Sequence, residues 1–258
     1  MNAFFLDRLN SEPHALAFAG QSTPWPVALA DQSTNPVLDG ELHAHAAAAQ
    51  ALLYPVAADL LATTGRPVDL FGFEANPARL GDAASAAASV PGIALTQLGA
   101  LIDAAELGYN PAKAKPIAVL GHSQGVLAVH MVQAIEQAGS IAAATAQINE
   151  ILAIATLIGV AGTRQARQLG LAARHGEATP MLSVKDITRA QVDALIARVS
   201  GVHGPIAVAV ANSATHYVLS GYPEDLAAFG VEVAKEHRRQ AKLREEKVRG
   251  GRVFDPVL

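Results

Sequence analysis

The feature that most constrains the fold is a turn sequence between an apolar run and a helix-like stretch. Residues 117–120 are apolar, Gly121-His122-Ser123-Gln124-Gly125 follows, and the residues after it have helical apolar spacing. A Gly-x-Ser-x-Gly sequence between a strand and a helix is typical of a nucleophile elbow, which holds the serine hydroxyl out at the sheet edge. Glycine on both sides of the serine avoids the crowding that a Cβ causes. Ser123 is therefore the first candidate for chemistry.

A serine in such a turn lies at a helix N-terminus, where backbone N–H groups have no acceptor within the helix. The N–H of Gln124 is expected to point to the place where a substrate oxyanion develops. The chain has no cysteine. A thiol nucleophile, a disulfide scaffold and thiolate metal ligands are thereby excluded, and no metal site is predicted.

Composition narrows the class of protein further. The chain has 258 residues, 51% hydrophobic and 16% charged, with a formal net charge of −4. This length fits one large α/β domain with or without a small one. The near-neutral charge and an aromatic content of 5% do not indicate nucleic-acid binding. We see no apolar run of membrane-spanning length and no signal peptide, and we expect a cytoplasmic protein that has neither nucleic acid nor membrane as a partner.

The order of predicted elements indicates an α/β fold with two domains. The first domain, residues 1–178, is predicted as an α/β-hydrolase-like core with a parallel sheet that carries the elbow. An irregular connection is expected over residues 67–89. Strands are predicted at residues 15–19 and 117–120, and helices at residues 41–64, 91–107, 126–138 and 141–158.

The second domain, residues 179–258, has a β-α-β-β-α order. This is a ferredoxin-like α+β unit that lacks its last strand. A tail over residues 235–252 carries eight of the nineteen Lys and Arg residues and is interpreted as a solvated helix end that continues into a loop. The expected elements are strands at residues 180–185, 206–210 and 217–221 and helices at residues 188–199 and from 223.

Three separated motifs coincide with this order: Phe18-Ala19-Gly20-Gln21 after the first strand, the elbow, and Asn212-Ser213 before the last strand. Together they resemble the acyl-CoA:acyl carrier protein transacylase family. The glutamine after the elbow serine, with the stretch at residues 20–25, looks most like the acetyltransferase domain of a type I fatty acid synthase of the bacterial or fungal kind.

The resemblance implies a ping-pong transfer of a short acyl group. Ser123 Oγ attacks an acyl-CoA thioester, and the 4'-phosphopantetheine thiol of an acyl carrier protein then removes the acyl group. The implied oxyanion donors are the N–H groups of Gln124 and Gln21, although Gln21 also fits an ordinary loop residue. No permanently bound cofactor is implied. Acetyl-CoA is the expected substrate, and the carrier protein and the other domains of a multifunctional synthase are the expected partners.

Three more positions are carried over from the family's pattern as residues of the substrate site. His122 is expected to support the elbow by packing and hydrogen bonding. Asn212 is expected to order the wall of the site, or else to be a strand-end turn residue. Ile151 stands near the position where malonyl-handling members carry an arginine, and no arginine occurs between Ser123 and Arg164. Since an unpaired buried carboxylate is costly, acetyl is favoured over malonyl unless Arg164 bends back into the site.

The chain departs from the family in one respect: no residue matches the histidine that acts as general base. We therefore expect a fragment with reduced or no activity, because the serine keeps only what oxyanion donors and binding supply.

Two other readings stay open. A serine hydrolase or thioesterase would pair Asp186 or Asp193 with His203 or His216. A non-enzymatic structural segment of a multidomain synthase would use its surface for contacts with neighbouring domains.

Overall fold

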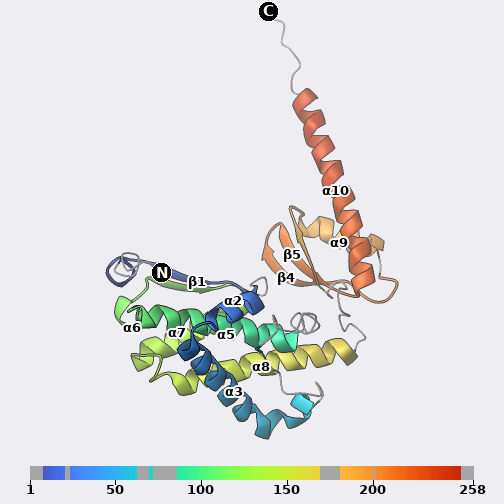
Figure 1. The fold of residues 1–258 in the computed structure, drawn as a ribbon. Coiled ribbons are helices and arrows are strands. Elements are labelled where there is room, and N and C mark those ends of the chain that lie inside the picture. Colours follow the sequence, from blue (N-terminus) through green and yellow to red (C-terminus); the bar gives the residue numbers. More distant parts are fainter. Residues whose placement is uncertain are drawn as a thin grey trace, which may run out of the picture. The chain divides into compact units, whose positions relative to one another are not determined.

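The computed structural model describes residues 8–20, 24–62, 70–71, 86–168, 181–199 and 201–250. The chain divides into two compact units, Met1–Gln168 and Leu169–Leu258 (Figure 1). The predicted domain boundary between residues 178 and 179 lies outside the described residues.

The first unit places two parallel strands beside a group of helices. β1 pairs with β2 from Ala15↔Ala118 to Phe18↔Gly121. Because the strands run in the same direction, the loop after β1 and the elbow after β2 meet at one end of the sheet. The elements are β1 (Ala15–Phe18), α2 (Trp25–Gln32), α3 (Pro36–Ala62), α5 (Ala86–Glu106), α6 (Pro111–Ala114), β2 (Ala118–Gly121), the 3-10 helix η2 (Ser123–Gly125), α7 (Val126–Ala138) and α8 (Thr145–Gln168).

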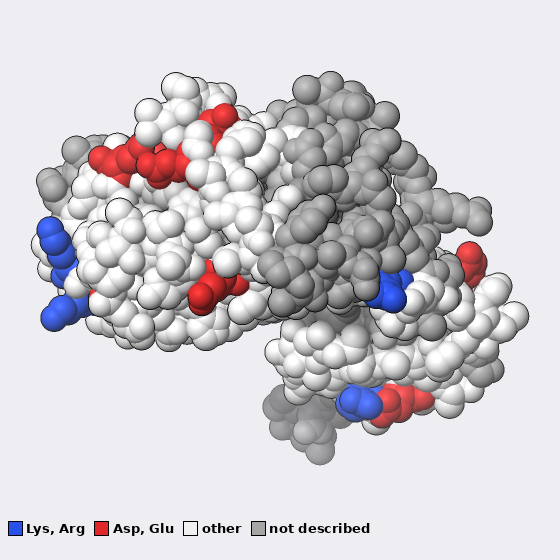
Figure 2. All heavy atoms as spheres, turned by 90° about the horizontal axis from the view of Figure 1, so that it is seen from below, with Lys and Arg blue, Asp and Glu red and all other residues white. Residues whose placement is uncertain are grey.

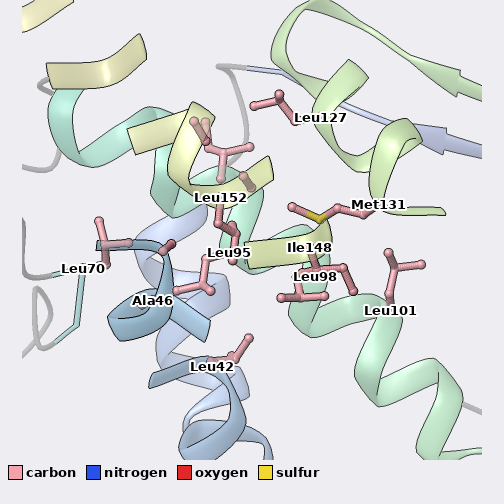
Figure 3. Close-up of a cluster of buried hydrophobic side chains, with 14 of the residues drawn as sticks. Leu42, Ala46, Leu70, Leu95, Leu98, Leu101, Leu127, Met131, Ile148 and Leu152 are labelled. Atoms are coloured by element: carbon pink, nitrogen blue, oxygen red, sulfur yellow. The ribbon is translucent and has the colours of Figure 1, made fainter. Parts of the chain in front are cut away.

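Helix α5 is the centre of the core of this unit. It packs against α2, α3, α7 and α8, and a helix surrounded by others needs no polar face. Figure 3 shows side chains of α3, α5, α7 and α8 directed toward one another, among them Leu42, Leu95, Met131 and Ile148. This packing fixes the position of the first turns of α5, and the part of α5 that contacts the elbow lies there.

Two helices of this unit are longer and more apolar than the sequence analysis expected. α5, and α8 over Thr145–Ala166, are long and apolar enough to cross a membrane by length and composition, with mean hydropathies of 1.3 and 1.4. In α5, 78% of the apolar window is buried inside the protein, so its place in the core accounts for its composition. The window of α8 is 39% buried, on the side that packs against α3 and α5.

The second unit is a three-stranded antiparallel sheet with two helices. Its strand order is β3-β5-β4, and apolar side chains of β3 and β5 pack with those of the helices around Phe229. β4 is almost wholly exposed. The elements are β3 (Met181–Lys185), α9 (Arg189–Val199), β4 (Ala207–Ser213), β5 (His216–Ser220) and α10 (Pro223–Gly250).

The mixed α/β fold with a parallel sheet is thus confirmed, and the β-α-β-β-α order is observed. A helix end that continues into a loop was expected over residues 235–252, whereas α10 continues as one helix to Gly250 (Figure 1). Ion pairs one turn apart along it, Lys235 with Glu232 and Arg239 with Glu236, support the helical conformation.

Candidate active site

Ser123 adopts a backbone conformation that few residues with a side chain adopt. Its φ is +56°, between an extended His122 and the helical residues that follow. A non-glycine residue in this region stores about 1–3 kcal/mol of strain, and such residues cluster at functional sites. The strand β2, the turn and the helix α7 follow one another as an elbow requires.

Both flanking glycines are needed because main-chain atoms lie against them. A Cβ on Gly121 would lie 2.5 Å from the backbone nitrogen of Val126, and a Cβ on Gly125 would lie 2.4 Å from the carbonyl oxygen of Phe18. Neither clash is relieved by turning a side chain. The main chain of the elbow therefore folds back against its own backbone and packs against the end of β1.

The end of β1 is bonded to the elbow, and the residue after it is bonded to α5, through successive carbonyl groups. His122 N donates to Phe18 O at 2.9 Å, and Gln97 Nε2 donates to Ala19 O at 2.6 Å. The next residue, Gly20, approaches the nucleophile so closely that a Cβ there would lie 2.8 Å from Ser123 Cβ and 3.3 Å from Ser123 Oγ. Gln21 lies outside the described residues, and its oxyanion role stays a prediction.

Ser123 is exposed, and its Oγ has no hydrogen-bond partner among the described residues. A general base for the serine is therefore not identified in this part of the chain. Gln124 is half-buried and turns its side chain inward, where Nε2 donates to Val90 O of α5 at 3.3 Å. Its main-chain N–H belongs to the first turn of η2, where N–H groups lack intrahelical acceptors.

His122 supports the elbow differently from the expected packing. Its side chain is exposed and makes no hydrogen bond that caps η2. The backbone carries the support instead: His122 N donates to the last residue of β1, and His122 O accepts from Gly125 N at 2.9 Å. A side-chain role for His122 toward substrate stays a prediction.

The other two predicted substrate residues lie on different units. Ile151 is a half-buried residue of α8 that packs against the core of the first unit. Asn212 is an exposed residue of β4 in the second unit, where its Nδ2 lies 3.5 Å from His216 Nε2. An irregularity in the β4–β5 pairing falls between Ala211 and Ser213, so Asn212 stands at a bulge.

Three of the four side chains that a hydrolase triad would use, those of Asp193, His203 and His216, make other contacts. Asp193 pairs with Arg189 at 2.8 Å, and His203 Nδ1 lies 3.1 Å from Asp225 Oδ1. His216 Nε2 lies 2.9 Å from Ser183 Oγ. Within the described residues, none of the four proposed acid–histidine pairs is hydrogen-bonded, which weakens the hydrolase reading.

Asp225, which the sequence analysis did not single out, organises the turn before β4. Burial raises the pKa of its carboxyl group, but hydrogen bonds from the His203 side chain and from the backbone N–H groups of Val202, His203 and Gly204 outweigh burial and leave the pKa below its ordinary value. Four donors on one carboxylate identify it as a structural residue of the second unit.

Gln97 is a residue of the site that sequence reasoning missed. It is a buried amide inside the apolar core helix α5, four residues after Ile93 and so on the face that Ile93 buries. A buried amide in such a helix needs a partner, and its partner is the loop beside Ser123. The signal in the sequence is a glutamine among the apolar residues of a helical pattern. No three His, Asp or Glu side chains of the described residues gather as metal ligands would.

The comparisons with known proteins agree with the class of fold. Residues 180–258 match the family model described as the fatty acid synthase central AT domain. The match spans the second unit, and the elbow lies outside it. The family match therefore concerns the second unit alone.

A solved structure extends the likeness to the first unit. The crystal structure of acyl-carrier-protein S-malonyltransferase from Bartonella henselae is similar with a TM-score of 0.51 and 17% sequence identity, over 87% of this chain. The chain spans 60% of the length of that protein. At this identity the likeness concerns the fold. No curated protein matches the sequence.

Proposed function

We propose that this chain carries the nucleophile of an acyltransferase that loads an acyl carrier protein in fatty acid synthesis. The observation that carries the proposal is the strained, exposed Ser123 between a parallel strand and a helix, with the Gly20 backbone packed against it. The family match over the second unit and the malonyltransferase-like fold point to the same class.

The reaction consists of two transfers of the acyl group, with an acyl-serine ester as the intermediate. Ser123 Oγ attacks the acyl carbonyl carbon of acyl-CoA, its proton passes to a base, and the C–S bond breaks to release the CoA thiol. The pantetheine thiol of the carrier protein then attacks the acyl-serine and restores the serine hydroxyl. The N–H groups of Gln124 and Gln21 stabilise the oxyanion of each tetrahedral intermediate, and loss of one such donor typically costs about 100- to 1,000-fold in kcat.

The proposed acyl group is acetyl or another short uncharged group. Ile151 is half-buried against the core and has no charge to offer a second carboxylate. A malonyl carboxylate buried there without a cationic partner is unfavourable. We further propose acyl-CoA as the donor, a multidomain synthase as the setting and the cytoplasm as the compartment.

Acyl loading measured by intact-protein mass spectrometry tests the proposal. The chain is incubated with acetyl-CoA or malonyl-CoA, and the modified residue is located by peptide mapping. Because no base contacts Ser123 Oγ among the described residues, we expect slow acetyl loading that added imidazole accelerates. Loading is expected at Ser123 and to vanish in Ser123→Ala, while Ser33→Ala, a matched serine of the same unit, loads as the wild type does.

The outcomes separate the class of reaction from the choice of substrate. Equal loading of Ser123→Ala and the wild type, with and without imidazole, contradicts the nucleophile. Faster loading from malonyl-CoA than from acetyl-CoA contradicts the acetyl preference alone.

A further inference from the structure

A second candidate site lies in the first unit, away from the elbow. Helix α3, the end of α5 and the start of α8 line a hollow of about 650 Å³ that is open to solvent, with a volume typical of small-molecule sites. Its contact with α5 is at Ile102, whereas the elbow reaches α5 at Val90. Twelve residues of helix separate these points by about 18 Å. The hollow is therefore distinct from the candidate active site.

The central polar group of the hollow is His45. This residue is 8% exposed, and its Nδ1 lies 2.6 Å from Oδ1 of Asn149 on α8, in direct contact. An amide oxygen only accepts, so Nδ1 carries the proton, and in the neutral ring Nε2 is then an acceptor. Nε2 has no partner among the described residues. The ring of His45 is nearly buried, and its Nε2 is an acceptor open to the hollow, where a ligand donor can reach it.

The other charged groups around the hollow have one sign. Glu41 and Glu106 line it, and neither Lys nor Arg does. Thr145 donates its hydroxyl hydrogen to Ala142 O at 2.9 Å, which leaves its oxygen as an acceptor. On the face of the first unit seen in Figure 2, acidic side chains form a band and basic side chains stand only at the edge. The hollow therefore presents acceptors and negative charge.

The rest of the lining is short and apolar. Alanines of α3 and α5, with Ile102 and Ile141, form the walls. These side chains leave room for an aliphatic chain and supply no further hydrogen bonds. A primary ammonium group has three donors and no acceptor, and a short alkyl body fits the apolar wall.

We propose that this hollow binds a small aliphatic ammonium ion, with His45 Nε2 accepting one N–H and the carboxylates of Glu41 and Glu106 neutralising the charge. The site is independent of acyl transfer, so the proposal does not rest on the function of Ser123.

The test uses the full 258-residue chain, labelled with ¹⁵N, and n-butylammonium as the probe. We expect saturable one-to-one shifts of the Asn149 side-chain amide and of amides near His45, under constant salt. Sodium butyrate and neutral 1-butanol have the same alkyl chain without the cation and are expected to give no saturable shift. Saturable binding of 1-butanol with equal affinity, or no saturation by n-butylammonium, overturns the proposal.

Two variants assign the binding to these residues. His45→Leu removes the buried acceptor and should weaken binding about tenfold or more. Glu41 and Glu106 are exposed, so a double change of both to Gln leaves the core intact and should weaken binding about two- to tenfold. Glu150→Gln, an exposed acid of α8 outside the hollow, is the matched control and should bind as the wild type does. Unchanged binding in the double variant contradicts the site even if His45→Leu fails to fold.

Discussion

Gly125→Ala tests whether the elbow and the loop after β1 touch as closely as the structure has them. Gly125 has ordinary helical angles, φ −57° and ψ −15°, so alanine adds no backbone strain there. The new Cβ would lie 2.4 Å from Phe18 O and 2.9 Å from Ala19 O. Both neighbours are main-chain atoms, and the loop must therefore move away from the elbow.

The size of the effect follows from two contributions. Overpacking of a closed contact costs about 1–3 kcal/mol. Moving Phe18 O also weakens its hydrogen bond from His122 N, worth about 0.5–1.5 kcal/mol. The free energy of unfolding of the first unit should fall by about 2–4 kcal/mol. Acyl loading of Ser123 should fall with it, because the Gly20 backbone is displaced from the serine.

Urea denaturation followed by circular dichroism, with hydrogen exchange of the β1 amides, measures this change. Gly40→Ala is the control: Gly40 is an exposed residue of α3 with nothing within 4 Å of its Cβ position. Alanine there should stabilise by about 0.5–1 kcal/mol. A Gly125→Ala variant as stable as the wild type, with unchanged exchange in β1, refutes the close packing.

Three further predictions concern single contacts. Gln97→Leu leaves Ala19 O without its donor, and thermal unfolding should show a loss of about 1–3 kcal/mol, with a lower loading rate at Ser123. Gly159→Ala places a Cβ 2.3 Å from a carbonyl oxygen of α5 and should cost about 1–3 kcal/mol in urea, whereas wild-type stability would contradict the α5–α8 packing. Hydrogen bonds, the largest from Arg239, lower the pKa of Glu236 from 4.5 to about 2. The stabilisation by the Glu236 carboxylate is present above about pH 4.5 and is lost as the pH falls toward 2. In urea denaturation, the loss of stability caused by Glu236→Gln should therefore shrink over that range. A loss of stability that does not depend on pH contradicts this contribution.

Local patterns predicted the elements best where the pattern was strongly periodic. The helix predicted at residues 126–138 is α7, with the same bounds, because a Gly at each side marks its ends. α5 begins five residues before the predicted helix, since Pro91 is accepted within its first two turns. α2 was missed, because Pro24 and Pro26 indicate a loop, although proline is also common in the first turn of a helix.

The predicted site residues divide in the same way. Ser123 and Gln124 follow from one local turn, and the backbone there has the conformation the turn requires. The role of the His122 backbone and the contact of Gln97 depend on how β1 and α5 pack on that turn, which no local pattern contains.

The sequence by itself determined the order of strands and helices and the position of the elbow, because glycines, prolines and apolar spacing act over a few residues. Only the tertiary structure decided which distant groups meet. Gln97 reaches a carbonyl 78 residues away, and His45 meets Asn149 across 104 residues. Such contacts depend on the packing of whole helices, in which many near-equivalent arrangements satisfy the same local pattern and close-packed side chains select one.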